Sequence, residues 1–392
     1  MDPWTLDPTV THLNHGSFGA CPRPVLVEQA RWQAEMEHNP VLFFMRTLQP
    51  ALERSRGVLA EFLGADPAGL VYVPNATSGI NAALGSIERR LGPGDEILIT
   101  DHAYNACRNV AEVAAQRSGA SLIEVPVPFP LYTPDDFTAA VLDRVTNSTR
   151  IVMVDWVTSP TGLVVSVADI IDRLEPEIPV LVDAAHAPGM IPVRLKKLGA
   201  SFVVGNCHKW MCAPKSAGFL FARADYRGSV VPATVSHGWN TEPLPGSSRF
   251  HNLFDWTGTD DPSARLSVPQ ALDTMAGLHD EGWLGVMAAN RDLVLRGREI
   301  ICDALGIDEP APATAIGSMA TIPLPGPRGP GMTGDLDPLT ERLRDEWNIE
   351  VPVFSWRNWP QRLLRISAQL YNTVADYERL AEALKSKLRS AP

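Results

Sequence analysis

Two residues suited to covalent chemistry, Lys209 and Asp183, lie next to apolar segments of the chain. Lys209 comes shortly after the apolar run 201–205 and is followed by WMC, so its surroundings are apolar. Partial burial would lower the pKa of its amine and favour the neutral, nucleophilic form. Asp183 ends the run 180–183, at the kind of strand end where α/β proteins bind ligands. Taken singly, a structural lysine and a helix-capping aspartate remain alternative interpretations.

The polar turn NATSG at residues 75–79 is a third feature, because it joins an apolar run to a helical segment. Backbone N–H groups at a helix N-terminus, together with the hydroxyls of Thr77 and Ser78, can hold a phosphate group. A simple helix cap is the alternative for this turn alone. The three features together favour a pyridoxal 5′-phosphate cofactor. The acid would keep the ring nitrogen protonated, and the lysine would form a Schiff base and later move a proton at the substrate's α-carbon.

The elements that must position these residues follow a regular pattern. Seven apolar runs predict strands at 71–73, 96–100, 121–125, 150–155, 180–183, 201–205 and 218–221. Between several of them the pattern predicts helices, at 78–91, 103–118, 135–145 and 167–174. This alternation is typical of βαβ units. We therefore expect an α/β fold with a mostly parallel central sheet and helices on both faces.

A second pattern follows the Pro- and Gly-rich stretch at 323–334. It predicts a helix at 335–347, strands at 349–354 and 363–367, and a terminal helix at 374–388, with a long connecting helix at 285–305. We therefore expect an N-terminal segment near the active site (1–25), a large cofactor-binding domain (26–275) and a small α+β C-terminal domain (276–392).

Composition excludes several classes of function. The chain has 392 residues and a formal net charge of −11, which argues against electrostatic binding to nucleic acid or to anionic membranes. No apolar run reaches the roughly 18 residues that a membrane-spanning helix needs. The five cysteines form no CxxC pair, which argues against a disulfide framework and a structural zinc site. We expect a cytoplasmic protein without a leader or a metal, acting on a small molecule.

Seven short motifs follow one another along the chain: HGSFG, NATSGIN, SPTG, DAAHAPG, NCHKW, TGTDDP and LRIS. Their order resembles that of the class V aminotransferase-like enzymes of fold type I, and within them most of all the isopenicillin N epimerase family. The resemblance extends from about residue 13 to residue 384, and DAAHAPGMIP and NCHKWMCAP are its most specific stretches. It implies the aspartate-aminotransferase-like fold and pyridoxal phosphate as cofactor.

The resemblance also implies a role for each matching residue. Lys209 would be the Schiff-base lysine, Asp183 the partner of the pyridinium nitrogen, and His186 a neighbour of the ring near its 3′-oxygen. Arg365 matches the arginine that binds the substrate's α-carboxylate, a role that suits a bidentate guanidinium. Thr259 would reach the phosphate of the neighbouring subunit, which implies a homodimer. The matches to phosphate-binding positions within the subunit are Thr77, Ser78, Asn206 and His208.

Two further segments match positions around the substrate. An aromatic ring of the segment 101–105 would stack on the cofactor; His102 is favoured by position, and Tyr104 is the alternative or a proton donor. The turn NHGS resembles a substrate-contacting turn, with Asn14, His15 and Ser17 as candidates, and a structural glycine turn is the alternative.

The sequence departs from its relatives in two places. Many class V enzymes carry an Asn that contacts the cofactor oxygen, but the segment SPTG at 159–162 has none. Cysteine desulfurases of this class carry a nucleophilic Cys shortly before the carboxylate-binding Arg, whereas Cys302 is the last cysteine of this chain. A persulfide-forming desulfurase is therefore disfavoured.

The reactions of this group all begin with removal of the α-proton and differ in the next step, which the fold does not decide. We expect epimerisation of an amino acid or a cysteine-containing conjugate, in secondary metabolism such as antibiotic biosynthesis. Epimerisation requires a second acid, for which His15, Tyr104 and His237 are candidates. A cysteine-conjugate C–S lyase is the second interpretation and an aminotransferase the third.

A protein without catalysis, such as a pyridoxal phosphate-binding regulator, is disfavoured because Lys209 and Asp183 are both present. The substrate side chain is not specified by these motifs. Candidates to contact it are His237, Trp239, Trp356 and Arg357.

Overall fold

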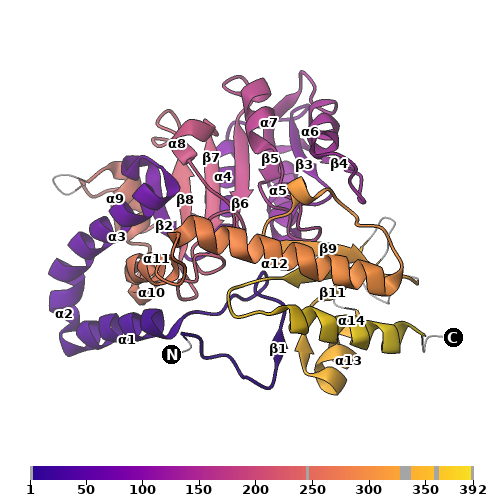
Figure 1. Cartoon of the computed structure of the whole chain (residues 1–392). Coiled ribbons are helices and arrows are strands. Elements are labelled where there is room, and N and C mark those ends of the chain that lie inside the picture. Colours follow the sequence, from indigo (N-terminus) through magenta and orange to yellow (C-terminus); the bar gives the residue numbers. More distant parts are fainter. Residues whose placement is uncertain (1–2, 244–246, 327–336, 357–361, 390–392) are drawn as a thin grey trace.

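A large central sheet and a smaller α+β unit make up the molecule (Figure 1). The computed structural model describes residues 3–243, 247–326, 337–356 and 362–389. The long helix α12 (Gly282–Leu305) runs between the two parts, as the predicted connecting helix requires (Figure 1).

The central sheet has seven strands: β2 (Leu70–Val73), β3 (Glu96–Thr100), β4 (Ser121–Val125), β5 (Thr149–Asp155), β6 (Val180–Ala184), β7 (Phe202–Asn206) and β8 (Gly218–Ala222). Their order is β2-β8-β7-β6-β5-β3-β4. The strands from β3 to β7 run parallel, whereas β8 is antiparallel to β7 and to β2. Each of the seven predicted strands is confirmed, and so is the mostly parallel α/β sheet.

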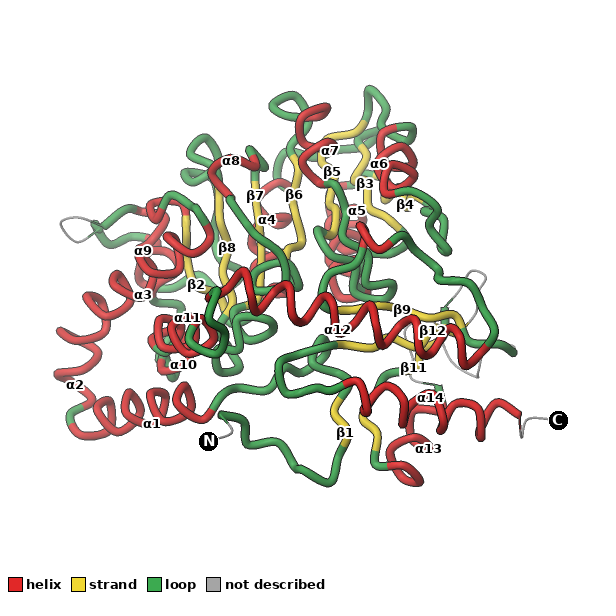
Figure 2. The backbone as a smooth tube through the Cα atoms, viewed as in Figure 1, coloured by secondary structure: helices red, strands yellow, loops and turns green. Residues whose placement is uncertain are grey.

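Helices cover both faces of this sheet, which explains why its strands are apolar throughout (Figure 2). Successive residues of a strand point to opposite faces. Accordingly, Ile151 belongs to the buried apolar cluster that includes residues of α4 (Ala76–Glu88) and α5 (Asn105–Ser118), whereas Val152 belongs to the cluster that includes α7 (Val167–Leu174). These helices and α6 (Pro134–Leu142) confirm the helices predicted between the strands, and the short α8 (Leu195–Leu198) follows β6.

The smaller unit contains a three-stranded antiparallel sheet in the order β11-β12-β9, formed by β9 (Met319–Pro323), β11 (Val353–Ser355) and β12 (Arg362–Ser367). It also contains α13 (Pro338–Trp347) and α14 (Val374–Arg389), and α14 packs along α12. The strand predicted at 349–354 is divided into β10 (Ile349–Glu350) and β11. β10 pairs in parallel with β1 (Thr11–His12), so the N-terminal segment joins the smaller unit.

Several helices were not predicted from the sequence. α1 (Arg23–His38), α2 (Pro40–Leu42), a π-helical turn (Phe43–Thr47) and α3 (Leu48–Leu63) form an arm at the lower left of Figure 1. α9 (Arg249–Asp255), α10 (Ser263–Leu266) and α11 (Val268–Ala276) follow the central sheet. The predicted domain boundary at 275/276 coincides with the end of α11 and stays a prediction.

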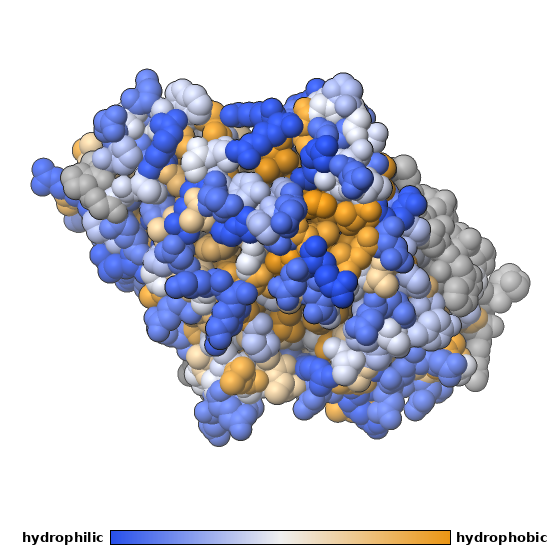
Figure 3. All heavy atoms as spheres, turned by 90° about the horizontal axis from the view of Figure 1, so that it is seen from above, coloured by the Kyte–Doolittle hydropathy of each residue, from blue (hydrophilic) through white to orange (hydrophobic). Residues whose placement is uncertain are grey.

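The surface that faces the top of Figure 1 is largely hydrophilic, with an apolar area near its middle (Figure 3). Within the described ranges, no helix combines the length and the apolar character needed to cross a membrane. Among the same residues, no three or more His, Cys, Asp or Glu side chains are grouped as metal ligands would be.

Candidate active site

A cavity of about 390 Å³ opens where the parallel strands β5, β6 and β7 end. Its walls include Asp155 and Asn206, the last residues of β5 and β7, and Asp183, the penultimate residue of β6. Parallel strands bring residues far apart in the sequence to one edge of the sheet. The cavity therefore gathers most of the predicted site residues, namely Ser17, Thr77, Tyr104, Asp183, His186, Asn206, His208 and Lys209.

Lys209 lies in the turn between β7 and β8, and its Nζ is 2.9 Å from His186 Nε2. Burial lowers the pKa of Lys209 to about 8, with the positive charge of Arg365 acting in the same direction and Asp183 opposing it. Its carbonyl oxygen accepts two hydrogen bonds, from the Cys212 N–H at 3.0 Å and from His15 Nε2 at 3.2 Å. These bonds hold the turn in place. A fixed backbone and a readily deprotonated amine suit a nucleophile.

Asp183 is held by hydrogen bonds at both carboxylate oxygens. Oδ1 accepts from the Ala185 N–H at 2.9 Å, and Oδ2 accepts from the Cys107 thiol at 3.1 Å. Asp155 occupies the paired position on the neighbouring strand. Burial, reinforced by the charge of Asp183, raises the pKa of Asp155 well above its ordinary value.

The N-terminus of α4 faces the same cavity. Asn75 caps this helix by accepting from the N–H and hydroxyl of Ser78, and Asn206 Oδ1 accepts from the Ala76 N–H at 2.8 Å. Gly218 permits this approach, because a Cβ there would lie 2.9 Å from Asn75 Cα. Thr77 lines the cavity, whereas Ser78, predicted to bind phosphate, lies outside it and donates to the capping residue Asn75.

His208 also lines this region, and its ring is neutral. Burial lowers its pKa to about 4. Its Nδ1 donates to the carbonyl oxygen of Ala217 at 2.7 Å, which assigns the proton to Nδ1.

Arg365 lies on β12, behind the wall of the cavity. Its Nη1 donates to the Ser159 carbonyl and hydroxyl oxygens at 2.6 and 3.2 Å, and its Nη2 donates to Ser17 Oγ at 2.7 Å. The buried Nε has no hydrogen-bond partner, and the described partners are all neutral. Burial lowers the pKa of Arg365 to about 10. A buried cation with no described counter-ion, next to two cavity residues, can bind an anionic group.

The expectation that His102 stacks on the cofactor does not fit the geometry. His102 is fully buried, with its ring nitrogens 2.7 Å from Thr161 Oγ1 and 3.2 Å from the Val127 carbonyl oxygen, and it lies outside the cavity wall. The rings of Phe129, Phe137 and Trp356 surround it. Tyr104, the alternative, lines the cavity and is half-exposed, so it replaces His102 as the aromatic candidate.

The N-terminal turn contributes Ser17 to the cavity but neither Asn14 nor His15. Asn14 accepts from the Ser17 N–H through its carbonyl oxygen at 3.1 Å, and His15 Nδ1 lies 3.0 Å from Tyr371 Oη. At Gly16, a Cβ would lie 2.4 Å from Met319 Sδ. The structural glycine turn is thus the better description of Asn14 and His15, and His15 is not placed as a second acid.

Other predicted residues lie away from this cavity. Thr259 is exposed on the loop between α9 and α10. His237 and Trp239 belong to a short 3₁₀ turn near α9, and Trp356 is buried against His102. Arg357 lies outside the described residues.

The cavity wall also contains residues that were not among the predicted site residues, such as Phe18, Cys107, Asp155, Lys215 and Ser216. Asp155 carried a usable signal, because it ends the apolar run that precedes the one ending in Asp183. Cys107 lies in the first turn of α5, and nothing in its sequence context separates it from a core cysteine.

Comparisons with known proteins identify the family of the chain. The profile of the family described as "Aminotransferase class-V" matches residues 27–252. Isopenicillin N epimerase from Amycolatopsis lactamdurans is 34% identical over 97% of this chain and 96% of its own length. An L-cysteine desulfhydrase from Arabidopsis thaliana is 30% identical over 96% of this chain and 87% of its own length.

A solved structure has the same fold. It is a C-DES mutant with glycine covalently linked to its PLP cofactor, and it matches with a TM-score of 0.78 and 19% identity over 96% of this chain and 97% of that chain.

Proposed function

Because the chain belongs to the class V aminotransferase family, an enzyme family that uses pyridoxal 5′-phosphate, we propose that it acts at the α-carbon of an amino acid or a cysteine-containing conjugate, with epimerisation as its reaction. The observation that carries this proposal is the shared cavity. It joins Lys209 and Asp183 to the residues that contact Arg365.

The residues present fit the cofactor. The cavity, about 390 Å³, is within the range of about 300–1,000 Å³ usual for small-molecule sites. The N-terminus of α4 and Thr77 supply donors for a phosphate, and Asp183 supplies a carboxylate for the ring nitrogen. Lys209 supplies the amine that binds the aldehyde. The buried, unpartnered Nε of Arg365 is a donor still available to an anionic ligand.

Each of these side chains has a distinct task. When bound, the cofactor stabilises negative charge at the substrate's α-carbon. Asp183 holds a proton at the ring nitrogen through its carboxylate, and Arg365 orients the substrate by its α-carboxylate. Lys209 Nζ, once released by the substrate amine, takes the proton from the α-carbon.

Epimerisation requires the proton to return to the face of the α-carbon opposite to the one from which it was removed. Tyr104 lines the cavity with a half-exposed side chain, and its hydroxyl is our candidate to return a proton on the face opposite Lys209. Similarity to isopenicillin N epimerase along nearly the whole of both chains supports epimerisation as the reaction.

A C–S β-lyase acting on cysteine or its conjugates is the second candidate, supported by the similarity to an L-cysteine desulfhydrase. In that reaction the same α-proton is removed and a sulfur leaving group departs from the β-carbon.

We also propose that the enzyme is a homodimer in which Thr259 contributes to the partner subunit's phosphate site. Thr259 is exposed and lies outside the cavity of its own subunit. The helical arm exposes large apolar side chains that a second copy would cover, including Val27, Val41 and Met45.

Mixing two inactive variants tests this arrangement. Lys209→Ala and Thr259→Asp chains, unfolded and refolded together, should recover about a quarter of wild-type activity, because half of the dimers are mixed and hold one intact site. No recovery from soluble mixed dimers would contradict the shared site.

Proton NMR in D2O tests the reaction itself. The holoenzyme is incubated with amino acids and cysteine conjugates, including isopenicillin N. Loss of the α-proton signal from an otherwise intact substrate, with inversion on chiral analysis, is the expected result. Release of a keto acid and a thiol would show that the reaction is C–S lysis and not epimerisation. Exchange with neither product in any substrate would contradict both assignments.

A further inference from the structure

His186 is held between two residues that are neighbours in the sequence. Its Nε2 is 2.9 Å from Lys209 Nζ, and its Nδ1 accepts a hydrogen bond from Trp210 Nε1 at 3.2 Å. Trp210 is fully buried and does not line the cavity. Its indole therefore reaches the reacting lysine only through the histidine ring.

The indole group determines where the histidine proton lies. An indole N–H can donate a hydrogen bond but cannot accept one, so His186 Nδ1 must be unprotonated. Burial lowers the pKa of His186 well below its ordinary value, so the ring is neutral and its single proton is on Nε2. That N–H points at Lys209 Nζ, which can accept a hydrogen bond only as an uncharged amine.

We propose that Trp210 is a positioning residue that fixes the tautomer of His186, so that His186 donates a hydrogen bond to Lys209 and holds its amine uncharged for reaction with an aldehyde. In that reaction Lys209 Nζ forms a C=N bond to the aldehyde carbon. Both amine hydrogens leave with the carbonyl oxygen as water, and nothing is oxidised or reduced. The inference rests on Lys209 being the covalent anchor of the proposed cofactor.

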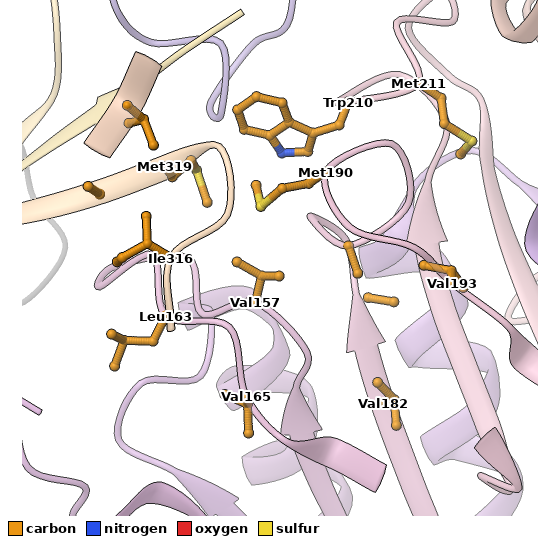
Figure 4. Packing of buried hydrophobic residues seen from close by; sticks show 14 of the residues in the cluster. Val157, Leu163, Val165, Val182, Met190, Val193, Trp210, Met211, Ile316 and Met319 are labelled. Atoms are coloured by element: carbon orange, nitrogen blue, oxygen red, sulfur yellow. The ribbon is translucent and has the colours of Figure 1, made fainter. Parts of the chain in front are cut away.

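The packing around Trp210 keeps the indole N–H in one direction. Met190 and Met319 lie beside the indole (Figure 4). The His15 ring is tilted against it with a centroid distance of 4.9 Å. Gly189 has φ +87°, and a Cβ there would lie 2.5 Å from the Trp210 carbonyl carbon, so the turn that carries His186 packs directly on this backbone.

The other groups that face Lys209 act in both directions. Asp183 on β6, Asp155 on β5 and Cys107 on α5 favour its charged form, whereas Arg365 on β12 opposes it. Without the Trp210 N–H, His186 can carry its proton on Nδ1 and accept from a lysine ammonium through Nε2. The acids would then favour the charged amine, and we expect the pKa of Lys209 to rise by about one to two pH units.

Trp210→Phe removes the N–H and keeps most of the apolar volume. Trp283→Phe is the matched control, because Trp283 Nε1 donates to the Leu272 carbonyl oxygen at 3.1 Å, outside the cavity wall. The rate of pyridoxal phosphate uptake by the cofactor-free full-length chain is measured against pH, from the rise of visible absorbance. No amino acid is present, so this readout does not depend on which reaction the enzyme catalyses.

The wild type and Trp283→Phe should show a midpoint near pH 8, the pKa of Lys209. Trp210→Phe should show a midpoint about one to two units higher, with uptake at pH 7 about 10- to 100-fold slower. A folded Trp210→Phe variant with an unchanged midpoint would overturn the inference. Loss of uptake only in Lys209→Ala would still support the cofactor assignment, so the two claims fail separately.

A measurement on the unaltered protein covers the case in which Trp210→Phe does not fold. Nitrogen-15 NMR of histidine-labelled cofactor-free protein, with His186 identified by its loss in His186→Gln, reports which ring nitrogen is protonated. At pH 9, where most of the Lys209 amine is uncharged, protonation of Nε2 alone is expected. A proton on Nδ1, or on both nitrogens, would overturn the inference.

Discussion

Replacement of Arg365 by Met should separate stability from function. Burial lowers the pKa of this guanidinium to about 10, and at roughly 1.4 kcal/mol per pKa unit the buried charge costs about 3 kcal/mol of folding free energy. Because the pKa of a base is lowered in the folded chain, this cost is fully present at neutral pH and begins to decrease only as the pH rises above about 10. Met removes the cost but leaves the Ser159 carbonyl without its donor, a loss of about 1–3 kcal/mol. The free energy of unfolding should therefore stay within about 2 kcal/mol of wild type.

Substrate turnover should respond very differently. Two charge-assisted hydrogen bonds to an α-carboxylate contribute about 1.5–3 kcal/mol each, so their loss should lower kcat/KM by about 10²- to 10⁴-fold. Urea unfolding gives the first quantity, and α-proton exchange in D2O gives the second.

Arg56→Met is the matched control. Arg56 is also buried, but its Nη2 is paired with Asp255 at 2.5 Å, and its removal leaves a buried carboxylate. Arg56→Met should lose about 3–5 kcal/mol of stability. If Arg365→Met lost as much, or kept its kcat/KM, the role of Arg365 as a carboxylate site would be refuted.

Three further predictions concern the cofactor and the buried His15. Lys209→Ala should lose the visible absorbance of the covalently bound cofactor and its activity, whereas the exposed Lys197→Ala should keep both; unchanged absorbance in Lys209→Ala would exclude that lysine. Asp183→Ala should retain some cofactor but lose about 10²- to 10⁴-fold in turnover, and near-wild-type rates would remove it from its role at the ring nitrogen. His15 has its pKa lowered to about 3 by burial, so below its ordinary value of 6.5 the unfolded chain binds a proton that the folded chain does not. When the pH falls from 6.5 to 5, the free energy of unfolding of His15→Gln should therefore decrease by about 2 kcal/mol less than that of the wild type. Urea unfolding at the two pH values measures this difference, and equal decreases would show that His15 does not contribute it.

Much of the fold followed from the sequence because both faces of the central sheet are covered. A strand such as β6 then needs an apolar residue at nearly every position, and its continuous run is easy to recognise. The strand assignment also predicted that Lys209 and Asp183 lie close together, since parallel strands end at the same edge of the sheet. The N-terminal arm was not predicted because the pattern of apolar residues in α1 is weak, and only Val25 of this helix is buried.

The side-chain directions in the site were harder to predict. His102 and Tyr104 share one short segment, and sequence position alone favoured His102. Thr161, which is distant in the sequence, turns the His102 ring away through a 2.7 Å hydrogen bond. The direction of the His15 side chain could not be predicted for the same reason, because its partners Tyr371 and Lys209 come from other parts of the chain.

Reduction of the holoenzyme with borohydride tests the central claim most directly. The reagent makes the link between cofactor and protein permanent, and peptide mass spectrometry then identifies the labelled residue. We expect a pyridoxyl group on Lys209. A label on Lys215, the other lysine of the cavity wall, or no labelled peptide at all, would contradict it.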